Sequence, residues 1–334
     1  MSHYIHLTIA EREKIIVLHT SGRSYRNIAE TLGRNVSTIS REVKRNSNNK
    51  EYSAVAAQEQ YRRRRKKCVR QKVLENEVIR TKVQTLFFEK QWSPEQISKR
   101  LFQENHIYQI SYNTIYRAIY VGMFNTKELK SLYGFNKASR KLRHRGKRRK
   151  KREAEETRGT FKITNSIHDR PQEANERSVI GHWEADTVLG KHGKSCLITS
   201  VDRHSRFLLS GKISVKQAEL LKDRMIPMFC TIPEEYRKSV TPDRGKEFAE
   251  YLKITQALNG MQFYFADPNS PWQRGTNENT NGLLREYFPK SCDFDNISDY
   301  EISDVVSKIN LRPRKCLNWL SPFEVFYGVS LHLI

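Results

Sequence analysis

The sequence predicts a multidomain protein in which an all-α helix-turn-helix region precedes an α/β domain with a mixed sheet. Three observations support this prediction. Helix-capping signals recur up to about residue 120, β-prone runs replace them after residue 175, and the charge differs sharply between the two halves. With 334 residues, 37% of them hydrophobic, the chain is long enough for two or three domains with buried cores.

Basic residues are concentrated in the N-terminal half. Residues 1–152 hold 36 lysines and arginines against 12 aspartates and glutamates, whereas residues 153–334 hold 24 against 25. The densest runs are RRRRKK (Arg62 to Lys67) and RKLRHRGKRRKKR (Arg140 to Arg152), and the second contains no acid. We expect the N-terminal half to meet a polyanion and the second run to be an exposed linker that binds phosphate. A solvated tail without a specific role is the alternative.

The first 50 residues predict a helix-turn-helix. Capping signals begin three short helices, the third at Ser37. Ala29, Gly33 and Ile39 supply the small, turning and apolar side chains that the motif needs at these offsets. A three-helix bundle without a DNA role would show the same core pattern, but the third helix also has an outward face of hydroxyl and basic side chains. The candidate DNA contacts on this face are Thr38, Ser40, Arg41, Lys44 and Arg45.

Residues 91–136 predict a second unit of this kind. Ser93, Pro94 and Gln96 have the residue types of a helix start, and Ser111 opens another helix after a longer connection than in the first unit. The candidate DNA contacts here are Asn113, Thr114 and Arg117. Between the two units, Tyr52 to Ile79 is predicted to form a long basic helix.

The C-terminal half changes to strand-like patterns. SVIGHWEADTVLG, KSCLITSVD and RFLLSGKIS are β-prone runs separated by short turns. The helical segment VKQAELLKDRMIPMF follows, then the strand SVTPD, a helix near residues 249–258 and the strand MQFYFAD. The order βββαβαβ predicts a mixed five-stranded sheet with helices on its faces.

Three carboxylates stand out in this half. In the first strand, Asp186 shares a face with His182 and Glu184, and aspartate is depleted from strand interiors. Asp243 ends the fourth strand, and Glu278 lies on a predicted helix face. Two aspartates and a glutamate are hard oxygen ligands that suit Mg²⁺ or Mn²⁺. The spacing alone is weak evidence, because 37 acids offer many such triples.

The strings GHWEAD, TPDRGKEF, DPNSPWQRGTNENTNGLLREYFPK and NLRPRKCLNWLSPFEVF carry a family resemblance. Behind the N-terminal LTIAEREKI and IAETLGRNVSTISREVKRN, they closely resemble DDE transposases of the insertion-sequence-thirty family over nearly the whole chain. The resemblance implies an RNase H-like catalytic domain in which Asp186, Asp243 and Glu278 are catalytic and bind metal, Mg²⁺ or Mn²⁺, as two ions. It also implies cleavage that leaves a 3′-hydroxyl, followed by attack of that hydroxyl on another phosphodiester.

The same resemblance implies double-stranded DNA as partner, both the terminal inverted repeats and the target. Because two DNA ends must be joined, we expect a homodimer or larger assembly on DNA. Arg274 and Arg285 are candidate phosphate contacts near the site, although arginine can instead neutralise a carboxylate-rich cleft. For His182 and Glu184 we favour structural hydrogen bonds, and for Glu247 a cap or a salt bridge.

The whole pattern predicts five parts and a location. No apolar run approaches the roughly 20 residues of a membrane span, and the five scattered cysteines form no C-x-x-C pair. We therefore expect a cytoplasmic, nucleoid-associated prokaryotic protein without a membrane partner. The predicted parts are a helix-turn-helix (1–50), a basic helical connector (51–90), the second unit (91–136), a basic linker (137–175) and the catalytic domain (176–334).

Two other functions fit parts of the sequence. A DNA-binding regulator with an inactive RNase H-like domain would share the N-terminal half, but the intact carboxylates disfavour it. A plain RNase H-like nuclease that cuts without joining would leave the two DNA-reading units unexplained.

Overall fold

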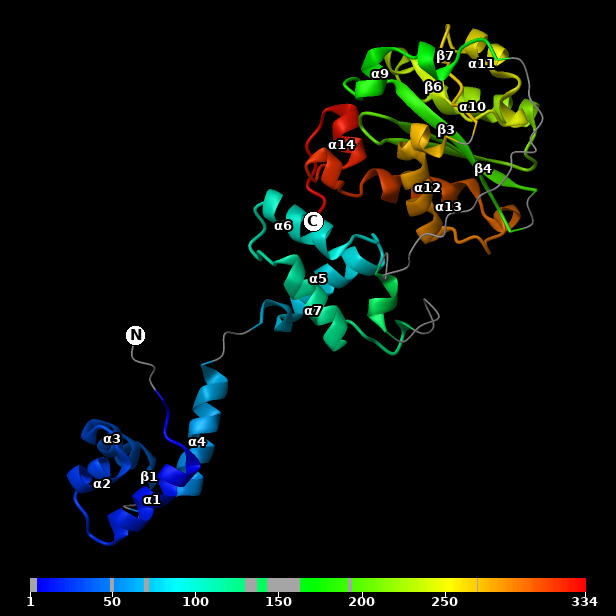
Figure 1. The fold of residues 1–334 in the computed structure, drawn as a ribbon. Helices are drawn as coiled ribbons and strands as arrows, with labels where there is room; N and C mark the ends of the chain where they lie inside the picture. The colour runs from blue at the N-terminus through cyan, green and yellow to red at the C-terminus, as the bar shows by residue number, and fades with distance from the viewer. Residues whose placement is uncertain are drawn as a thin grey trace. The chain divides into compact units, whose positions relative to one another are not determined.

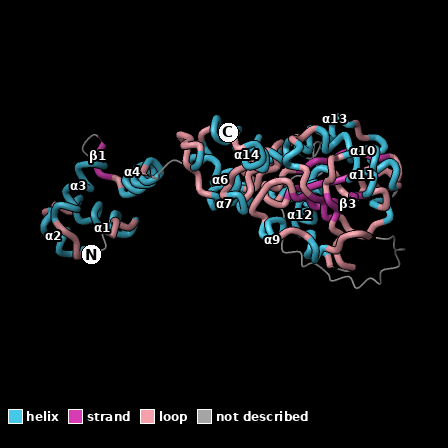
Figure 2. The backbone as a smooth tube through the Cα atoms, turned by 90° about the horizontal axis from the view of Figure 1, so that it is seen from above, coloured by secondary structure: helices cyan, strands magenta, loops and turns pink. Residues whose placement is uncertain are grey.

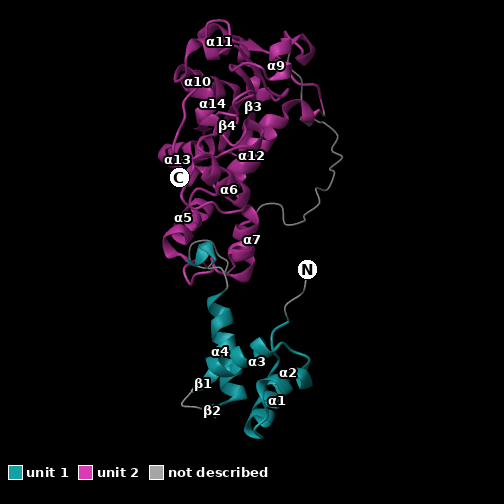
Figure 3. Ribbon diagram, turned by 90° about the vertical axis from the view of Figure 1, so that its left-hand side faces the viewer, with its two compact units in different colours: residues 1–75 teal, residues 76–334 magenta. Residues whose placement is uncertain are grey.

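A computed structural model describes residues 5–48, 51–68, 72–129, 137–142, 163–191, 194–268 and 270–334. The chain forms two compact units, Met1–Glu75 and Asn76–Ile334 (Figure 3). This division passes through the predicted connector, residues 51–90, while the five-part division itself stays a prediction. Of the predicted basic linker, residues 143–162 lie outside the described part. No helix among the described residues is long and apolar enough to span a membrane.

The first unit is a small helical domain. Its elements are α1 (Ile9–Thr20), α2 (Tyr25–Leu32), α3 (Val36–Asn46), the two-stranded β1 (Ser47–Asn48) and β2 (Glu51–Tyr52), and α4 (Ala54–Lys67). The predicted capping box is present, because the Glu11 N–H donates to the Thr8 hydroxyl at 3.2 Å and the Thr8 N–H donates to the Glu11 carboxylate at 2.7 Å. Gly33 ends α2 at φ +60°, as its left-handed conformation requires. Ile39 is fully buried beneath α3.

Two predicted helix limits in this unit are wrong. The helix α3 begins after Asn35, not at Ser37, and the Asn35 side chain accepts from the Ser37 N–H at 2.9 Å. Asparagine and serine cap equally well, so the sequence did not separate them. The predicted helix from Tyr52 to Ile79 is interrupted, because α4 ends at Lys67 and the next α-helix begins only after a new cap, Asn76. The basic run fills the last turn of α4, where cations are stabilised by the helix dipole.

The second unit begins with three helices: α5 (Glu77–Phe88), α6 (Pro94–Gln103) and α7 (Tyr112–Val121). The capping box of Ser93 and Gln96 is present as predicted, with Pro94 at the first helical position, and Ser111 caps α7. Ile97 and Ile115 are fully buried between the helices.

Hydrogen bonds and ion pairs connect this group of helices to the C-terminal segment of the chain. The Arg100 guanidinium donates to both oxygens of Glu324, at 3.0 and 2.7 Å, and to Glu104 at 2.6 Å. Glu104 in turn accepts the backbone N–H groups of Leu333 and Ile334 at 2.8 and 3.1 Å. All three ionic side chains are almost completely buried. The helices therefore form one body with the α/β part of the unit.

The α/β part is built on a five-stranded mixed sheet, as predicted (Figure 1). The strands are β3 (His182–Leu189), β4 (Cys196–Asp202), β5 (Leu208–Ile213), β6 (Ser239–Thr241) and β7 (Gln262–Phe263), in the spatial order β5-β4-β3-β6-β7. Strands β3 to β5 are antiparallel, whereas β3, β6 and β7 are parallel. The predicted order βββαβαβ is confirmed, and β3 is central.

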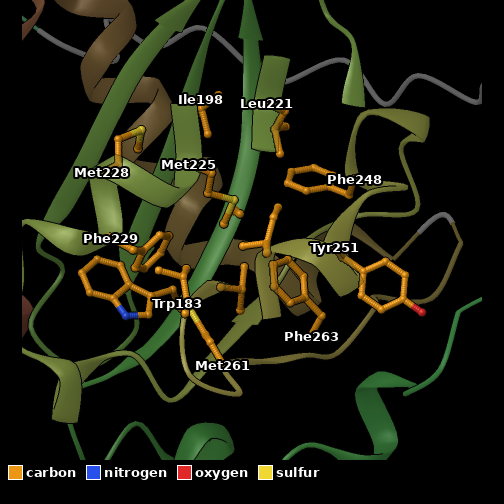
Figure 4. Packing of buried hydrophobic residues seen from close by; sticks show 14 of the residues in the cluster. Trp183, Ile198, Leu221, Met225, Met228, Phe229, Phe248, Tyr251, Met261 and Phe263 are labelled. Atoms are coloured by element: carbon orange, nitrogen blue, oxygen red, sulfur yellow. The ribbon is translucent and has the colours of Figure 1, made fainter. Parts of the chain in front are cut away.

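Helices cover both faces of this sheet (Figure 2). On one face lie α10 (Ala218–Cys230) and α11 (Tyr251–Ala257), and on the other α12 (Gly275–Tyr287) and α13 (Asp299–Asn310); the short α9 (Gln172–Glu176) precedes β3, and α14 (Pro322–Tyr327) is near the chain end. Trp183 and Ala185 of β3 point into the core under α10, where the Trp183 ring meets Phe229 edge-on at 5.2 Å between centroids (Figure 4). The alternation of a strand therefore turns Glu184 and Asp186 toward α12.

Candidate active site

Two aspartates lie on neighbouring parallel strands, Asp186 within β3 and Asp243 just beyond the end of β6. Glu184 of β3 is in register with Thr241 of β6, and Asp186 and Asp243 each follow two residues later. Both side chains are half-buried. The Asp243 carboxylate accepts from the Gly245 N–H at 3.0 Å, which holds the turn after β6. The parallel register of β3 and β6 thus explains why Asp186 and Asp243, 57 positions apart in the sequence, lie close together.

The Arg274 guanidinium lies between these aspartates. Its Nη1 atom is 3.7 Å from an oxygen of Asp186, and its Nη2 atom is 3.5 Å from an oxygen of Asp243. Nη1 also donates to the Ala185 carbonyl at 3.2 Å. Of the two roles considered for Arg274, this geometry corresponds to neutralisation of a carboxylate-rich site.

Asp186 experiences opposing influences. Burial raises the pKa of its carboxyl above the ordinary value, the charge of Arg274 lowers it, and the nearby Asp243 raises it again. The Asn281 amide donates to Asp186 at 3.1 Å, and the Thr187 N–H donates to its other oxygen at 2.9 Å. The two aspartates are therefore close enough to repel each other, and a cation stabilises them together.

Helix α12 carries the third carboxylate. Glu278 lies one turn after Arg274 on this helix and is exposed. No side chain of α12 caps its own start; instead the fully buried Glu184 accepts the Asn277 N–H at 2.8 Å and pairs with the Arg203 guanidinium. The sheet thereby fixes the first turn of α12, and with it the backbone of Glu278.

The three carboxylates are the kind of oxygen ligand that binds a divalent metal ion, but they are not yet close enough together to share one. Within the described ranges, no group of three His, Cys, Asp or Glu side chains is close enough together to hold a metal ion. Asp186 and Asp243 offer oxygen atoms to one positive charge, at present that of Arg274. A divalent cation is matched by the same hard donors, and Glu278 on the adjoining helix turn would have to bring its side chain toward them.

Other residues near the site have structural contacts. The Arg285 guanidinium donates to the Leu189 carbonyl at 2.7 Å, so it is held against the end of β3. His182 is hydrogen-bonded to Ser239 at 2.7 Å and to Glu173 at 2.8 Å. The salt bridge expected for Glu247 is present, with Lys216 at 2.6 Å.

The predicted DNA-reading side chains lie on the outer faces of α3 and α7. Arg41, Lys44 and Arg45 are exposed on α3, and Thr38 and Ser40 are half-buried beside them. On α7, Asn113 and Arg117 are exposed, and the Thr114 hydroxyl lies 3.0 Å from that of Ser111. Both sets have the placement that binding to DNA requires, and their role stays a prediction.

The pair of Glu184 and Arg203 was not recognised as an ion pair in the sequence. Arg203 follows β4 directly, and its side chain is only 5% exposed. An arginine after a strand carries no periodic signal of burial, so only the fold identifies its partner.

Two family models match the chain. A helix-turn-helix domain matches residues 3–46, and an integrase core domain matches residues 176–271. The chain is 39% identical to the transposase InsI for insertion sequence element IS30A of Escherichia coli, over 98% of this chain and 85% of that protein. It is 35% identical to the transposase for insertion sequence element IS1086 of Cupriavidus metallidurans, over 98% of this chain and 95% of that protein.

A comparison with solved structures gives matches of low identity. The catalytic core domain of BIV integrase matches 45% of this chain and 95% of that chain, with 15% identity and a TM-score of 0.36.

Proposed function

The chain belongs to the insertion-sequence-thirty (IS30) family of transposases, and on this premise we propose that Asp186, Asp243 and Glu278 form the centre that cuts and joins DNA strands. Its helix-turn-helix and integrase core domains make it a DNA-binding polynucleotidyl transferase. The observation that carries the proposal is the parallel register of β3 and β6, which places two aspartates around one positive charge.

Mg²⁺ or Mn²⁺ would be held by these three carboxylates, and when bound it would supply activation of an attacking oxygen and stabilisation of the leaving one. Arg274, which forms ion pairs with both aspartates, would place its charge on a DNA phosphate at the same site. Asn281 holds Asp186 in orientation through its amide. Glu184 fixes the helix turn from which Glu278 would reach the aspartates.

The reaction consists of two displacements at phosphorus. In the first, water forms a bond to phosphorus and the strand leaves with a 3′-hydroxyl. In the second, that hydroxyl attacks another phosphodiester, whose own 3′-oxygen leaves. One phosphorus–oxygen bond forms and one breaks in each step, so neither ATP nor a covalent protein intermediate is required.

DNA recognition is assigned to the two outer helix faces. The exposed side chains of α3 and α7 would read the terminal inverted repeats, with basic residues on phosphates and the hydroxyl and amide groups on base edges. Arg285 would act beside the site only after exchanging its carbonyl partner for phosphate. Because two ends are joined, a dimer or larger assembly on DNA is proposed.

Labelled DNA from the ends of the protein's own element tests this function. We expect the intact protein to cut and join the ends with Mg²⁺ or Mn²⁺, whereas Asp186→Asn, Asp243→Asn and Glu278→Gln bind the DNA but do neither. Asp223→Asn is the matched control, because this exposed aspartate lies on α10 at the opposite face of the sheet.

Each other outcome identifies a different function. Binding without cutting by the intact protein would support the regulator. Cutting without joined strands would support a nuclease, and cutting by Asp243→Asn would contradict the choice of carboxylates.

A further inference from the structure

An arginine-lined hollow lies beside the first turns of α12. It has a volume of about 220 Å³. The residues that line it include Arg177, Arg206, Arg314, Gly275, Thr276 and Asn279. The lining comes from the loops after α9, β4 and α13 and from the first turns of α12. Segments far apart in the sequence thus bring three arginines to one place, of which Arg314 is largely buried and donates to the Ile309 carbonyl at 3.4 Å.

The hollow has a strong excess of positive charge. Among the described residues that line it, there is no aspartate or glutamate. The Arg206 guanidinium donates to the Thr276 hydroxyl at 2.8 Å, a neutral partner. Gly275 and Thr276 are also the first residues of α12, where the Glu184 carboxylate already accepts the Asn277 N–H, so the excess charge of the hollow comes from its arginines.

The like charges are felt by a neighbouring group. Burial lowers the pKa of the Arg203 guanidinium, Glu184 opposes this effect, and the charges of Arg177 and Arg206 lower it further. Arg177 ends α9 in a left-handed conformation, φ +60°, and its charge acts on Arg203 together with that of Arg206. An anion in the hollow would reduce the repulsion among these cations.

The position of the hollow identifies the anion. Glu278 and Asn281 of α12, with Arg274 just before the helix, lie on the active-site face, whereas Thr276 and Asn279 line the hollow from roughly the opposite side of the same turns. A helix is about 10–12 Å across, and successive nucleotides of a strand rise about 3.4 Å. A phosphate in the hollow would therefore lie about three nucleotides from a phosphodiester at the carboxylates.

A wider groove continues from the hollow. It has a volume of about 870 Å³, shares Asn279 and Arg314 with the hollow, and extends along Lys315 and Lys141 to the start of α6. Its lining also includes Glu95 and Glu286, which pair with Lys315 and Arg312. Its cations outnumber its acids, so a strand that leaves the hollow has a path of net positive charge toward α6.

We propose that the arginine hollow is a subsite for one backbone phosphate of the DNA strand that reacts at the carboxylates, about three nucleotides from the reacting phosphodiester. This inference rests on the proposed function, since it takes the carboxylates as the reacting centre. It adds a specific interaction that fixes the strand relative to that centre.

The test compares DNA binding by the full chain with that of Arg177→Gln/Arg206→Gln, without divalent metal so that no strand is cut. For end DNA, the slope of log affinity against log salt should become shallower by about 0.9 for each phosphate that the variant no longer neutralises. Lys253→Gln is the matched control, an exposed charge on α11 at the other face of the sheet, and its slope should equal that of the intact protein. An unchanged slope in the double variant would overturn the proposal.

A second arm locates the phosphate. DNA from the element ends is prepared with one uncharged methylphosphonate in place of a single phosphate, at a different position in each sample. At one position, about three nucleotides from the cut, the intact protein should bind this DNA more weakly than unmodified DNA. The double variant should bind both equally. Equal weakening for both proteins at every position would overturn the proposal. A second result would also overturn it. If millimolar inorganic phosphate stabilises only the intact protein against unfolding, and the double variant binds DNA as the intact protein does, the hollow takes a free anion only.

Folding and function are separated within the same experiment. If the double variant does not fold, Arg177→Gln replaces it, because the Arg177 side chain has no hydrogen bond or ion pair with any described residue. If the intact protein shows the position-specific effect but never cuts DNA, the subsite stands and the proposed function fails. If it cuts DNA but shows no position-specific effect, the subsite fails alone.

Discussion

Glu184 should control both the stability of the α/β domain and the position of Glu278. Its side chain is fully buried, that of its partner Arg203 is 5% exposed, and it accepts the Asn277 N–H at the start of α12. Replacing Glu184 with alanine leaves a buried cation unpaired, which costs about 3–5 kcal/mol. Removal of the negative charge at the helix start adds up to about 1 kcal/mol.

We therefore expect Glu184→Ala to lower the free energy of unfolding of this domain by about 3–6 kcal/mol. Glu184→Gln should cost less, because an amide oxygen can still accept from Asn277. In the double variant Glu184→Ala/Arg203→Met, the cost should be smaller than the sum of the single costs by about 2 kcal/mol or more.

The assay is urea unfolding of the full chain with hydrogen exchange measured on peptides of α12 and β3. Exchange should rise first at α12, and the DNA-cutting rate of Glu184→Gln should fall although all three carboxylates remain. A cost below about 1 kcal/mol for Glu184→Ala, or strictly additive costs in the double variant, would refute this reasoning.

Three further predictions concern the other interactions. Arg100→Met should destabilise the packing of α6 on the C-terminal segment by about 3–5 kcal/mol, and the double variant Arg100→Met/Glu324→Met should recover part of this loss. Hydrogen exchange of α6 measures both effects. Additive losses from the two substitutions would contradict the prediction. The hydrogen bond from Arg34 lowers the pKa of Glu11 to about 2; burial opposes this effect and the hydrogen bonds with Thr8 add to it. The contribution of the Glu11 carboxylate to stability is therefore present above about pH 4.5 and is lost as the pH falls toward 2. Exchange of α1 should show this loss in the intact chain and not in Glu11→Gln; the same pH dependence in both would exclude Glu11 as its source. Lys44→Gln on α3 should reduce the salt slope of DNA binding by about 1, and an unchanged slope would remove Lys44 from the DNA interface.

Local signals in the sequence predicted the elements well. The capping residues Thr8, Ser93 and Ser111 begin the helices that they were expected to begin, because a cap acts on backbone groups two or three positions away. The alternation along β3 also separated Trp183 from Asp186 correctly. Such features depend only on near neighbours in the chain.

Interactions over long separations were not accessible in the same way. Arg274 lies between two aspartates only because β6 pairs with β3 and α12 crosses them, and no local pattern states that geometry. The ion pair between Arg100 and Glu324 joins residues 224 positions apart. Arginines in these places have the same sequence signature as exposed ones.

Glu278 gives the most direct test of the central claim, because it is the one carboxylate of the three that lies on a helix and is exposed. The measurement is strand joining from pre-cut, labelled element ends with Mg²⁺, which isolates the second displacement. Glu278→Gln should bind the ends normally and join them at least about 100-fold more slowly, whereas Glu219→Gln, exposed on α10, should join them at the full rate. Joining by Glu278→Gln at the rate of the intact protein would contradict the assignment of this centre.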